Sequence, residues 1–360
     1  MEKFSCKTTI IAGAGAISAL GERNIRRLFF ITDPYFMENG TARRVAATAK
    51  AEAVEFFDKV QPDPSVELAA EGTAQLKNFH PDTVVALGGG SAMDCAKAMV
   101  YFSKENCPLV AIPTTSGSGS EVTDFAILTH GKTKHPLVDP ALQPDTAILD
   151  SDLLQGLPKG LIADTGFDVL AHALEAAVAK NAGTISDLYA REAFRITYAA
   201  LPASFAGRKE VRGKVHMAAT LAGMAFTQAG LGLCHAMAHS LGGMFHVPHG
   251  RLNAILLPTV VACNAHTAGS KYAQLAQAAG IGGSAETVAV RNLKNGLIRL
   301  RKELNLPETL AQAGVDPRSV WNNVGTIVQS TLADPCCASN PVAVDDFLVR
   351  RILESVTGRV

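Results

Sequence analysis

Short hydrophobic runs rich in β-branched and aromatic residues alternate with segments of helical period over the first 150 residues. Strands alternating with helices are typical of βαβ units, which build a mostly parallel sheet. The runs predict strands at 27–32, 53–58, 82–87 and 108–112, with 146–150 as the last strand, and helices at 40–51, 65–78 and 91–103. Two further runs, 125–130 and 134–139, predict a hairpin appended to that sheet.

The pattern changes after about residue 153, where long segments rich in alanine and leucine repeat at helical period. They predict helices at 166–179, 185–204, 208–227, 231–245, 251–265, 284–304 and 343–357. We therefore expect an α/β domain of the Rossmann type at 1–152, followed by an all-α domain at 153–360. A cleft between two such domains would be the default ligand site.

Composition excludes several classes of protein. Lys plus Arg and Asp plus Glu number 33 each, so the net charge is zero and a nucleic-acid partner is not expected. No apolar run reaches the length of a membrane span, and the N-terminus does not resemble a secretory signal. Seven scattered cysteines without a CxxC pair indicate reduced thiols in a cytoplasmic compartment.

Four histidines fall within fifteen residues, at 235, 239, 246 and 249. His235 and His239 are four apart, so they share one face of a predicted helix. The pair Gly242-Gly243 could end that helix, after which His249 could fold back toward the same point. The spacing of His246 takes it off this face.

A second pair four residues apart, Asp168 and His172, lies upstream on another predicted helix. Three imidazoles and one carboxylate from two helices suit Zn²⁺ or Fe²⁺. A single histidine on an apolar helix face is usually a hydrogen-bonded core residue. The clustering of four histidines, together with the pair of Asp168 and His172, favours a metal site instead.

Gly88, Gly89 and Gly90 follow a predicted strand and precede a helix that opens at Ser91. Ser91 and Asp94 have capping-box spacing. Glycines allow close approach of the backbone to a ligand, and a helix N-terminus suits a pyrophosphate. The loop lacks the GxGxxG pattern, so by itself it could equally be a structural turn.

A second polar loop, IPTTSGSGSEVT at 112–123, follows the next predicted strand and suits phosphate and ribose contacts. Asp33 closes the strand at 27–32. A carboxylate there could accept a hydrogen bond from a ribose 2′-hydroxyl and would repel a 2′-phosphate, which favours NAD over NADP. The alternative is an ordinary turn aspartate ahead of Pro34.

These motifs, in this order, resemble the iron-containing alcohol dehydrogenase family. The matching stretches are GGGSAMDCAKA, IPTTSGSGSEVT, the block from DSDLLQGLP to TGFDVLAHALEA, and HAMAHSLGGMFHVPHG. The resemblance covers the chain from about residue 4 to its C-terminus. It implies a dehydroquinate synthase-like architecture, with the nearest likeness to the enzymes of propanediol and ethanolamine utilisation.

The resemblance also implies roles for individual residues. Asp168, His172, His235 and His249 match the metal ligands, so that Asp168 and His235 also count among the catalytic residues, and His239 is the candidate proton carrier. Asp33 matches the position that selects NAD, and Lys134 a lysine near the nicotinamide ribose. The remaining expected cofactor contacts are Gly89, Gly90, Ser91, Asp94, Thr114, Thr115 and Ser118.

The implied activity is the NAD(H)-linked interconversion of a short-chain aldehyde and a primary alcohol, with Fe²⁺ or Zn²⁺ as the metal. A glycerol dehydrogenase or another polyol or hydroxy-acid oxidoreductase on the same scaffold is the alternative. We expect a cytoplasmic homo-oligomer that recycles NAD in a bacterial catabolic pathway. Association with the proteins of a bacterial microcompartment is a further expectation.

Overall fold

The computed structural model describes residues 4–131 and 133–359. They form two compact units, one of Ser5–Leu157 and one of Phe4 with residues 158–359. The predicted boundary, between residues 152 and 153, lies inside the 3₁₀ turn η4 (Ser151–Leu154).

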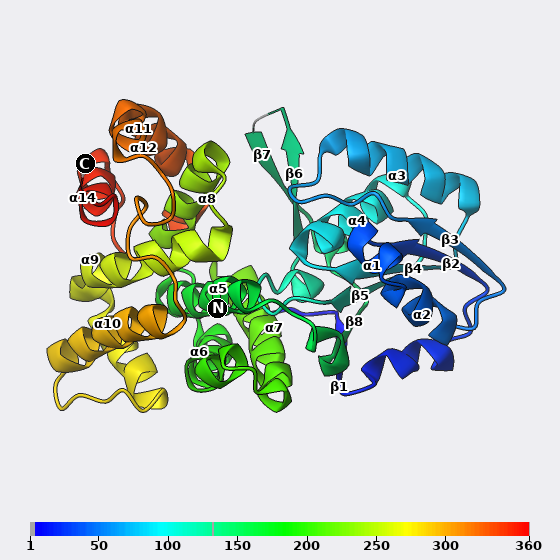
Figure 1. The fold of residues 1–360 in the computed structure, drawn as a ribbon, viewed down its shortest axis with the longest axis horizontal. Helices are drawn as coiled ribbons and strands as arrows, with labels where there is room; N and C mark the ends of the chain where they lie inside the picture. Colours follow the sequence, from blue (N-terminus) through cyan, green and yellow to red (C-terminus); the bar gives the residue numbers. More distant parts are fainter. Residues whose placement is uncertain (1–3, 132, 360) are drawn as a thin grey trace. The chain divides into compact units, whose positions relative to one another are not determined.

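The first unit contains a six-stranded parallel sheet in the order β1-β8-β5-β4-β2-β3 (Figure 1). Its strands are β1 (Thr9–Gly13), β2 (Arg27–Ile31), β3 (Ala53–Phe57), β4 (Thr83–Gly88), β5 (Leu109–Pro113) and β8 (Thr146–Asp150). The five predicted strands and their parallel arrangement are confirmed. The strand predicted at 146–150 is the last along the chain, as expected. The prediction missed β1, which forms the edge of the sheet beside β8.

Alternating side chains of β2 fill two separate cores, one on each face of the sheet. Phe29 packs against helices α3 (Val66–Phe79) and α4 (Gly90–Ser103). Phe30 packs on the other face against the 3₁₀ helix η1 (Ala16–Glu22) and helix α2 (Thr41–Thr48). A short helix, α1 (Pro34–Glu38), precedes α2. Burial on both faces is what a parallel sheet requires.

The predicted hairpin is confirmed as an antiparallel pair, β6 (Phe125–His130) and β7 (Thr133–Val138). It forms a two-stranded sheet of its own, so the expectation that it extends the main sheet was wrong. Thr129 instead bridges to Ser65, at the start of α3, and β6 also packs on α4. The hairpin therefore lies beside helices rather than at an edge of the main sheet.

Among the described residues of the second unit, every regular element is a helix, as predicted. Helix α5 lies among α6, α7 and α9, and the buried face of α5 extends almost along its whole length (Figure 1). The helices are α5 (Lys159–Val178), α6 (Thr184–Phe205), α7 (Arg212–Ala229), α8 (Leu233–Phe245), α9 (His249–Ala278), α10 (Glu286–Glu303), α11 (Pro317–Asn322), α12 (Val324–Ala333), α13 (Cys336–Ser339) and α14 (Asp346–Val356).

Helix α8 ends at Phe245, as the predicted range 231–245 has it. The suggestion that Gly242 and Gly243 end the helix was wrong, since α8 continues through both and His246 caps it with a left-handed φ of 55°. The residue that leaves the helical conformation ends the helix, and glycine inside it is tolerated. The segment that contains α11, α12 and α13 carried no prediction, because these helices are short and weakly periodic.

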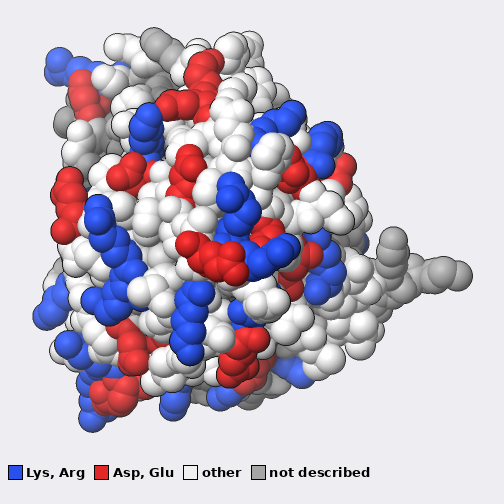
Figure 2. Space-filling model, turned by 90° about the vertical axis from the view of Figure 1, so that its right-hand side faces the viewer, with Lys and Arg blue, Asp and Glu red and all other residues white. Residues whose placement is uncertain are grey.

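Acidic and basic side chains intermingle on the face of the molecule in Figure 2, as equal numbers of the two kinds allow. Several of them form exposed pairs, such as Lys59 with Glu71 at 2.5 Å. Among the described residues no single helix is long and apolar enough to cross a membrane, although one bent pair, 209–229 with 233–245, meets that test by length and composition. All seven cysteines are free thiols.

Candidate functional site

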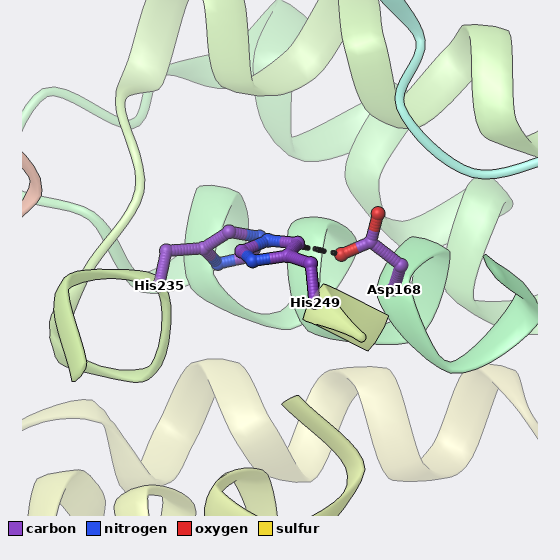
Figure 3. A group of neighbouring side chains, drawn as sticks. All are labelled: Asp168, His235 and His249. Atoms are coloured by element: carbon purple, nitrogen blue, oxygen red, sulfur yellow. Dashed lines mark ion pairs between the residues drawn. The ribbon is translucent and has the colours of Figure 1, made fainter. Parts of the chain in front are cut away.

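Three helices of the second unit bring the four predicted metal ligands together. Asp168 and His172 come from α5, His235 from α8, and His249 is the first residue of α9. Asp168 Oδ1 lies 3.5 Å from His249 Nε2, 3.7 Å from His235 Nε2 and 4.0 Å from His172 Nε2. Figure 3 shows the carboxylate of Asp168 facing the rings of His235 and His249.

These spacings fit a divalent cation. Ligands about 2.0–2.2 Å from a tetrahedral ion lie roughly 3.4 Å from one another. Asp168 Oδ1 lies 3.5 Å from His249 Nε2 and 3.7 Å from His235 Nε2, close to that separation, and the three donors all lie within 4.8 Å of one another. One carboxylate oxygen with imidazole nitrogens is a donor set that suits Fe²⁺ or Zn²⁺.

His172 occupies a different position from the other two imidazoles. Its ring is stacked between Phe226 and His235, with ring centroids 4.5 Å from each. It is also buried, with 5% of its surface exposed. His172 therefore lies in contact with the cluster and can supply a fourth donor, at the longest of the three separations from Asp168.

Glu175 positions His235, and the sequence analysis missed it. Its Oε2 accepts a hydrogen bond from His235 Nδ1 at 2.6 Å, which directs Nε2 toward Asp168. The same carboxylate accepts the backbone N–H groups of Gly232, Cys234 and His235 at 2.6–3.2 Å, so it caps the N-terminus of α8. A carboxylate behind a metal-binding histidine is a common arrangement that fixes the tautomer.

Asn253, one turn after His249 on α9, braces the carboxylate. Its Nδ2 donates to Asp168 Oδ1 at 2.7 Å and lies 3.2 Å from His249 Nε2. Asn253 is fully buried. Its position four residues after His249 is the helical spacing that could have identified it from sequence, as is the position of Glu175 seven residues after Asp168.

The start of α9 lies directly against α5. A Cβ atom on Gly250 would overlap the backbone carbonyl of Asp164, so only glycine allows this approach. The next residue, Arg251, makes a bidentate ion pair with the Asp164 carboxylate at 2.9 and 3.1 Å. These contacts place His249 beside Asp168, and neither was expected from sequence.

The cluster is strongly coupled. Burial raises the pKa of Asp168, but the charges of His172 and His249 and the hydrogen bond to His235 together hold it well below its usual range. Burial lowers the pKa of His235, whereas its hydrogen bonds to Asp168 and Glu175 raise it to about 9. A cation and a proton would compete for His235 Nε2.

His239, the expected proton carrier, lies one turn after His235 on α8. Its ring is stacked on that of His249, with centroids 5.2 Å apart and planes 15° apart. Its Nδ1 lies 2.8 Å from Asp334 Oδ2. Asp334 follows α12, 95 residues along the chain, and no local pattern in the sequence pointed to it.

In the first unit, Asp33 lies where the sheet topology predicts a nucleotide. The chain leaves β2 toward β3 and leaves β4 in the opposite direction, toward β5. The carboxyl ends of strands at such a switch point are the usual ligand position in open α/β sheets. Asp33 follows β2 and Gly88 ends β4, and Asp33 Oδ2 lies 3.6 Å from where a Cβ on Gly88 would be.

The two predicted loops lie side by side at these strand ends. Thr114 N–H donates to the Gly88 carbonyl at 2.9 Å. A Cβ on Gly89 would lie 3.3 Å from Thr115 Oγ1, and one on Gly90 3.2 Å from Ser118. The structure thus brings together the glycines and hydroxyls expected to contact the cofactor.

The expected capping box at the start of α4 was wrong. The helix begins at Gly90, Gly89 is its cap without a side-chain hydrogen bond, and Ser91 lies in the first turn. Asp94 instead accepts from Ser120 Oγ at 2.7 Å and from the Ile127 N–H at 3.2 Å. These bonds connect α4 to the polar loop and to β6, and they leave the first N–H groups of α4 without a side-chain cap.

Two lysines lie close to this region. Lys97 is almost fully buried, with Nζ donating to Ser120 Oγ, Thr123 Oγ1 and the Phe125 carbonyl at 2.7–3.0 Å. Lys134, the residue expected near the nicotinamide ribose, pairs with Asp63 at 2.6 Å on the exposed hairpin. Burial raises the pKa of Asp94 overall, and the charge of Lys134 is one of the smaller effects that lower it.

Comparisons with known proteins agree with this architecture. Residues 7–151 match the model of the iron-containing alcohol dehydrogenases, and residues 162–357 match that of the C-terminal region of the Fe-containing alcohol dehydrogenase family. The chain is 38% identical to the 1-propanol dehydrogenase PduQ of Citrobacter freundii, over 99% of this chain and all of that protein. It is 35% identical to an NADPH-dependent butanol dehydrogenase of Clostridium saccharobutylicum, over 99% and 98% of the two chains.

Among solved structures, a 1,3-propanediol oxidoreductase superposes with a TM-score of 0.93 at 30% identity, over 98% of this chain and 99% of that one. The chain therefore belongs to the iron-containing alcohol dehydrogenase family and is an alcohol dehydrogenase of the iron type. The expected family and the dehydroquinate synthase-like fold are confirmed.

Proposed function

We propose that the chain interconverts a short-chain aldehyde and its primary alcohol with NAD(H), with propionaldehyde and 1-propanol as the representative pair. The observation that carries the proposal is the Asp168 cluster, whose donors have the separations that a divalent cation requires. The likeness over the full chain to a protein named 1-propanol dehydrogenase supports the substrate class.

Asp168, His172, His235 and His249 would hold the metal, either Fe²⁺ or Zn²⁺. When bound, the cation supplies Lewis acidity at the substrate oxygen, and the nicotinamide exchanges the hydride. His239 takes the hydroxyl proton in alcohol oxidation and returns it in aldehyde reduction.

The first unit would bind the dinucleotide at the switch point between β2 and β4. Gly89, Gly90 and Ser91 offer backbone N–H groups at the start of α4 to the pyrophosphate. Asp94, Thr114, Thr115, Ser118 and Lys134 are the further proposed contacts. The carboxylate of Asp33 favours NAD over NADP, in contrast to the cofactor in the name of the butanol dehydrogenase.

In the cell, we propose that the enzyme is cytoplasmic and homo-oligomeric and recycles NAD in a catabolic pathway. The resemblance to the propanediol-utilisation branch supports this role. It also supports a proposed association with microcompartment proteins. An enzyme in such a position consumes an aldehyde and regenerates oxidised cofactor.

An anaerobic assay tests the proposed activity. Protein purified without air, stripped of metal and reloaded with Fe²⁺ should oxidise NADH when propionaldehyde is added, and glycerol with NAD⁺ should be a poor pair. The variant His235→Ala should lose bound metal and turnover together. Full activity of the metal-free protein, or glycerol as the preferred substrate, would contradict the proposal.

A further inference from the structure

A second cluster of polar side chains lies beside the proposed metal ligands. It consists of His239 on α8, Asp334 after α12, and Cys336 at the start of α13, with one donor atom from each within 4.8 Å of the others. His239 is 27% exposed and Asp334 14% by side chain. His239 is the proposed proton carrier, so this cluster could either bind a cation or orient His239 for proton transfer.

The distances separate the two alternatives. His239 Nδ1 and Asp334 Oδ2 are 2.8 Å apart, the length of a direct hydrogen bond to a charged acceptor. Two ligands of one tetrahedral cation would lie roughly 3.4 Å apart. The Asp168 cluster, with its separations of 3.5–4.0 Å, is spaced for a cation, whereas the Asp334 pair is spaced for a proton.

The carboxylate of Asp334 is itself fixed. Its Oδ1 accepts the backbone N–H of Cys336 at 2.8 Å, and its own N–H donates to the Thr331 carbonyl at the end of α12. One oxygen therefore binds the backbone while the other binds His239. Burial raises the pKa of Asp334, but its hydrogen bond to His239 lowers that pKa overall, so the group is ionised at neutral pH.

The ring of His239 is restrained on a second side. It is stacked on His249 at 5.2 Å with an angle of 15°, and it meets His235 edge-on at 6.2 Å. Stacking limits the tilt of the ring, and the Asp334 hydrogen bond sets its rotation about χ2. Together these contacts define which nitrogen carries the permanent proton.

We propose that Asp334 is a positioning residue that fixes His239 with its proton on Nδ1, leaving Nε2 as the atom that exchanges a proton with the substrate. The proposal rests on the proposed alcohol dehydrogenase function. In oxidation the alcohol O–H bond breaks and its proton forms a bond to Nε2, while the C–H bond of the same carbon breaks and the C=O bond forms; bound NAD⁺ would accept the hydride. The imidazolium that results keeps its Nδ1–H bond to Asp334, and aldehyde reduction reverses each step.

Kinetics of the isosteric variant Asp334→Asn test this assignment. An asparagine can donate to Nδ1 and so favour the wrong tautomer. We expect kcat to fall by about 10²- to 10⁴-fold, with KM for the aldehyde, metal content and NADH affinity unchanged. His239→Gln should lose as much, and the double variant no more than either, because the two residues act as a unit.

Asp316→Asn is the matched control. Asp316 caps α11 through its side chain in the same unit and is exposed, so this variant should keep the kcat of the wild-type chain. A fall of kcat by less than about threefold in Asp334→Asn, or additive losses in the double variant, would overturn the proposal, since proton-transfer partners typically contribute 10²-fold or more.

A readout independent of turnover separates this proposal from the proposed function. Nitrogen-15 NMR of the His239 ring, assigned by its absence in His239→Gln, should show a protonated Nδ1 in the wild-type chain and a changed tautomer in Asp334→Asn. If no aldehyde is reduced by the wild-type chain, this result still decides the role of Asp334. A second equivalent of bound Zn²⁺ that disappears in Cys336→Ser would show a cation site and overturn it.

Discussion

In the helical unit the groups proposed to bind a ligand are side chains, whereas in the α/β unit many of them are backbone N–H groups. The imidazoles and the carboxylate of the metal cluster are held by other buried side chains, such as Glu175 and Asn253. At the switch point, the glycines after β4 and the start of α4 offer N–H groups that no side chain caps. The two units thus carry different kinds of candidate group.

This difference determines which substitutions each region tolerates. A side chain that binds metal depends on the partners that orient it, so changes at some distance from the metal still reach it. A backbone site depends on conformation and on the absence of side chains, as at Gly88, where φ is 153°. We therefore expect variants that remove one function and leave the other intact.

Gly250→Ala should have the largest effect on the helical unit. Its Cβ would overlap the carbonyl of Asp164, so α9 must move away from α5 and carry His249 with it. We expect metal affinity to fall by more than about 100-fold, beyond the loss typical of outer partners, while NADH binding to the α/β unit persists. Metal analysis and NADH fluorescence titration measure the two properties.

Gly243→Ala is its control. This glycine also lies in a helix of the same unit, and a Cβ there would meet nothing within 4 Å. Alanine is the better helix former, so metal affinity and stability should be kept. Equal metal affinity in the two variants would show that the close approach of α9 to α5 does not position His249.

Glu175→Gln should have a smaller effect. The change keeps the size of the side chain but removes the charge that accepts His235 Nδ1 and three backbone N–H groups. Loss of such a partner typically costs 10- to 100-fold in metal affinity, about 1.4–2.7 kcal/mol. Competition with a chromophoric chelator measures it. Affinity equal to that of the wild-type chain would mean that Glu175 serves only to cap α8.

Asp33→Asn should have the smallest effect and should act on the α/β unit alone. Asparagine can still accept the Phe36 N–H that Asp33 Oδ1 accepts at 3.1 Å, so the start of α1 is kept. Removal of the charge lessens repulsion of a 2′-phosphate, and we expect the preference for NADH over NADPH in kcat/KM to fall by about tenfold. An unchanged preference with unchanged metal content would leave Asp33 as a helix cap only.

Much of the metal site could be predicted from sequence because helical spacing is local. The pairs Asp168 with His172 and His235 with His239 are each four residues apart, and each pair lies on one helix. Asp334 could not be found in this way, because it reaches His239 from 95 residues away through tertiary packing. Gly250 was missed because a close approach between two helices leaves no periodic signal.

The fold could be predicted where hydrophobic runs were long. The prediction failed where the hydrophobic pattern was weak or where tertiary contacts determine the structure. The strand β1, Thr9–Gly13, is an edge strand with half-exposed residues, so its hydrophobic pattern is weak. Asp94 had the spacing of a capping box but binds Ser120 and Ile127 instead, since the polar loop and the hairpin offer partners that local sequence does not show. Such contacts are set by tertiary structure alone.

X-ray absorption at the iron edge tests the central claim most directly. The protein is loaded anaerobically with one equivalent of Fe²⁺, with His235→Ala as the control. We predict only nitrogen and oxygen neighbours at about 2.0–2.2 Å in the wild-type chain and no bound iron in the variant. A sulfur neighbour at about 2.3 Å would place the metal at the Cys336 cluster, and iron retained by His235→Ala would show that His235 does not hold it; either result would contradict the account.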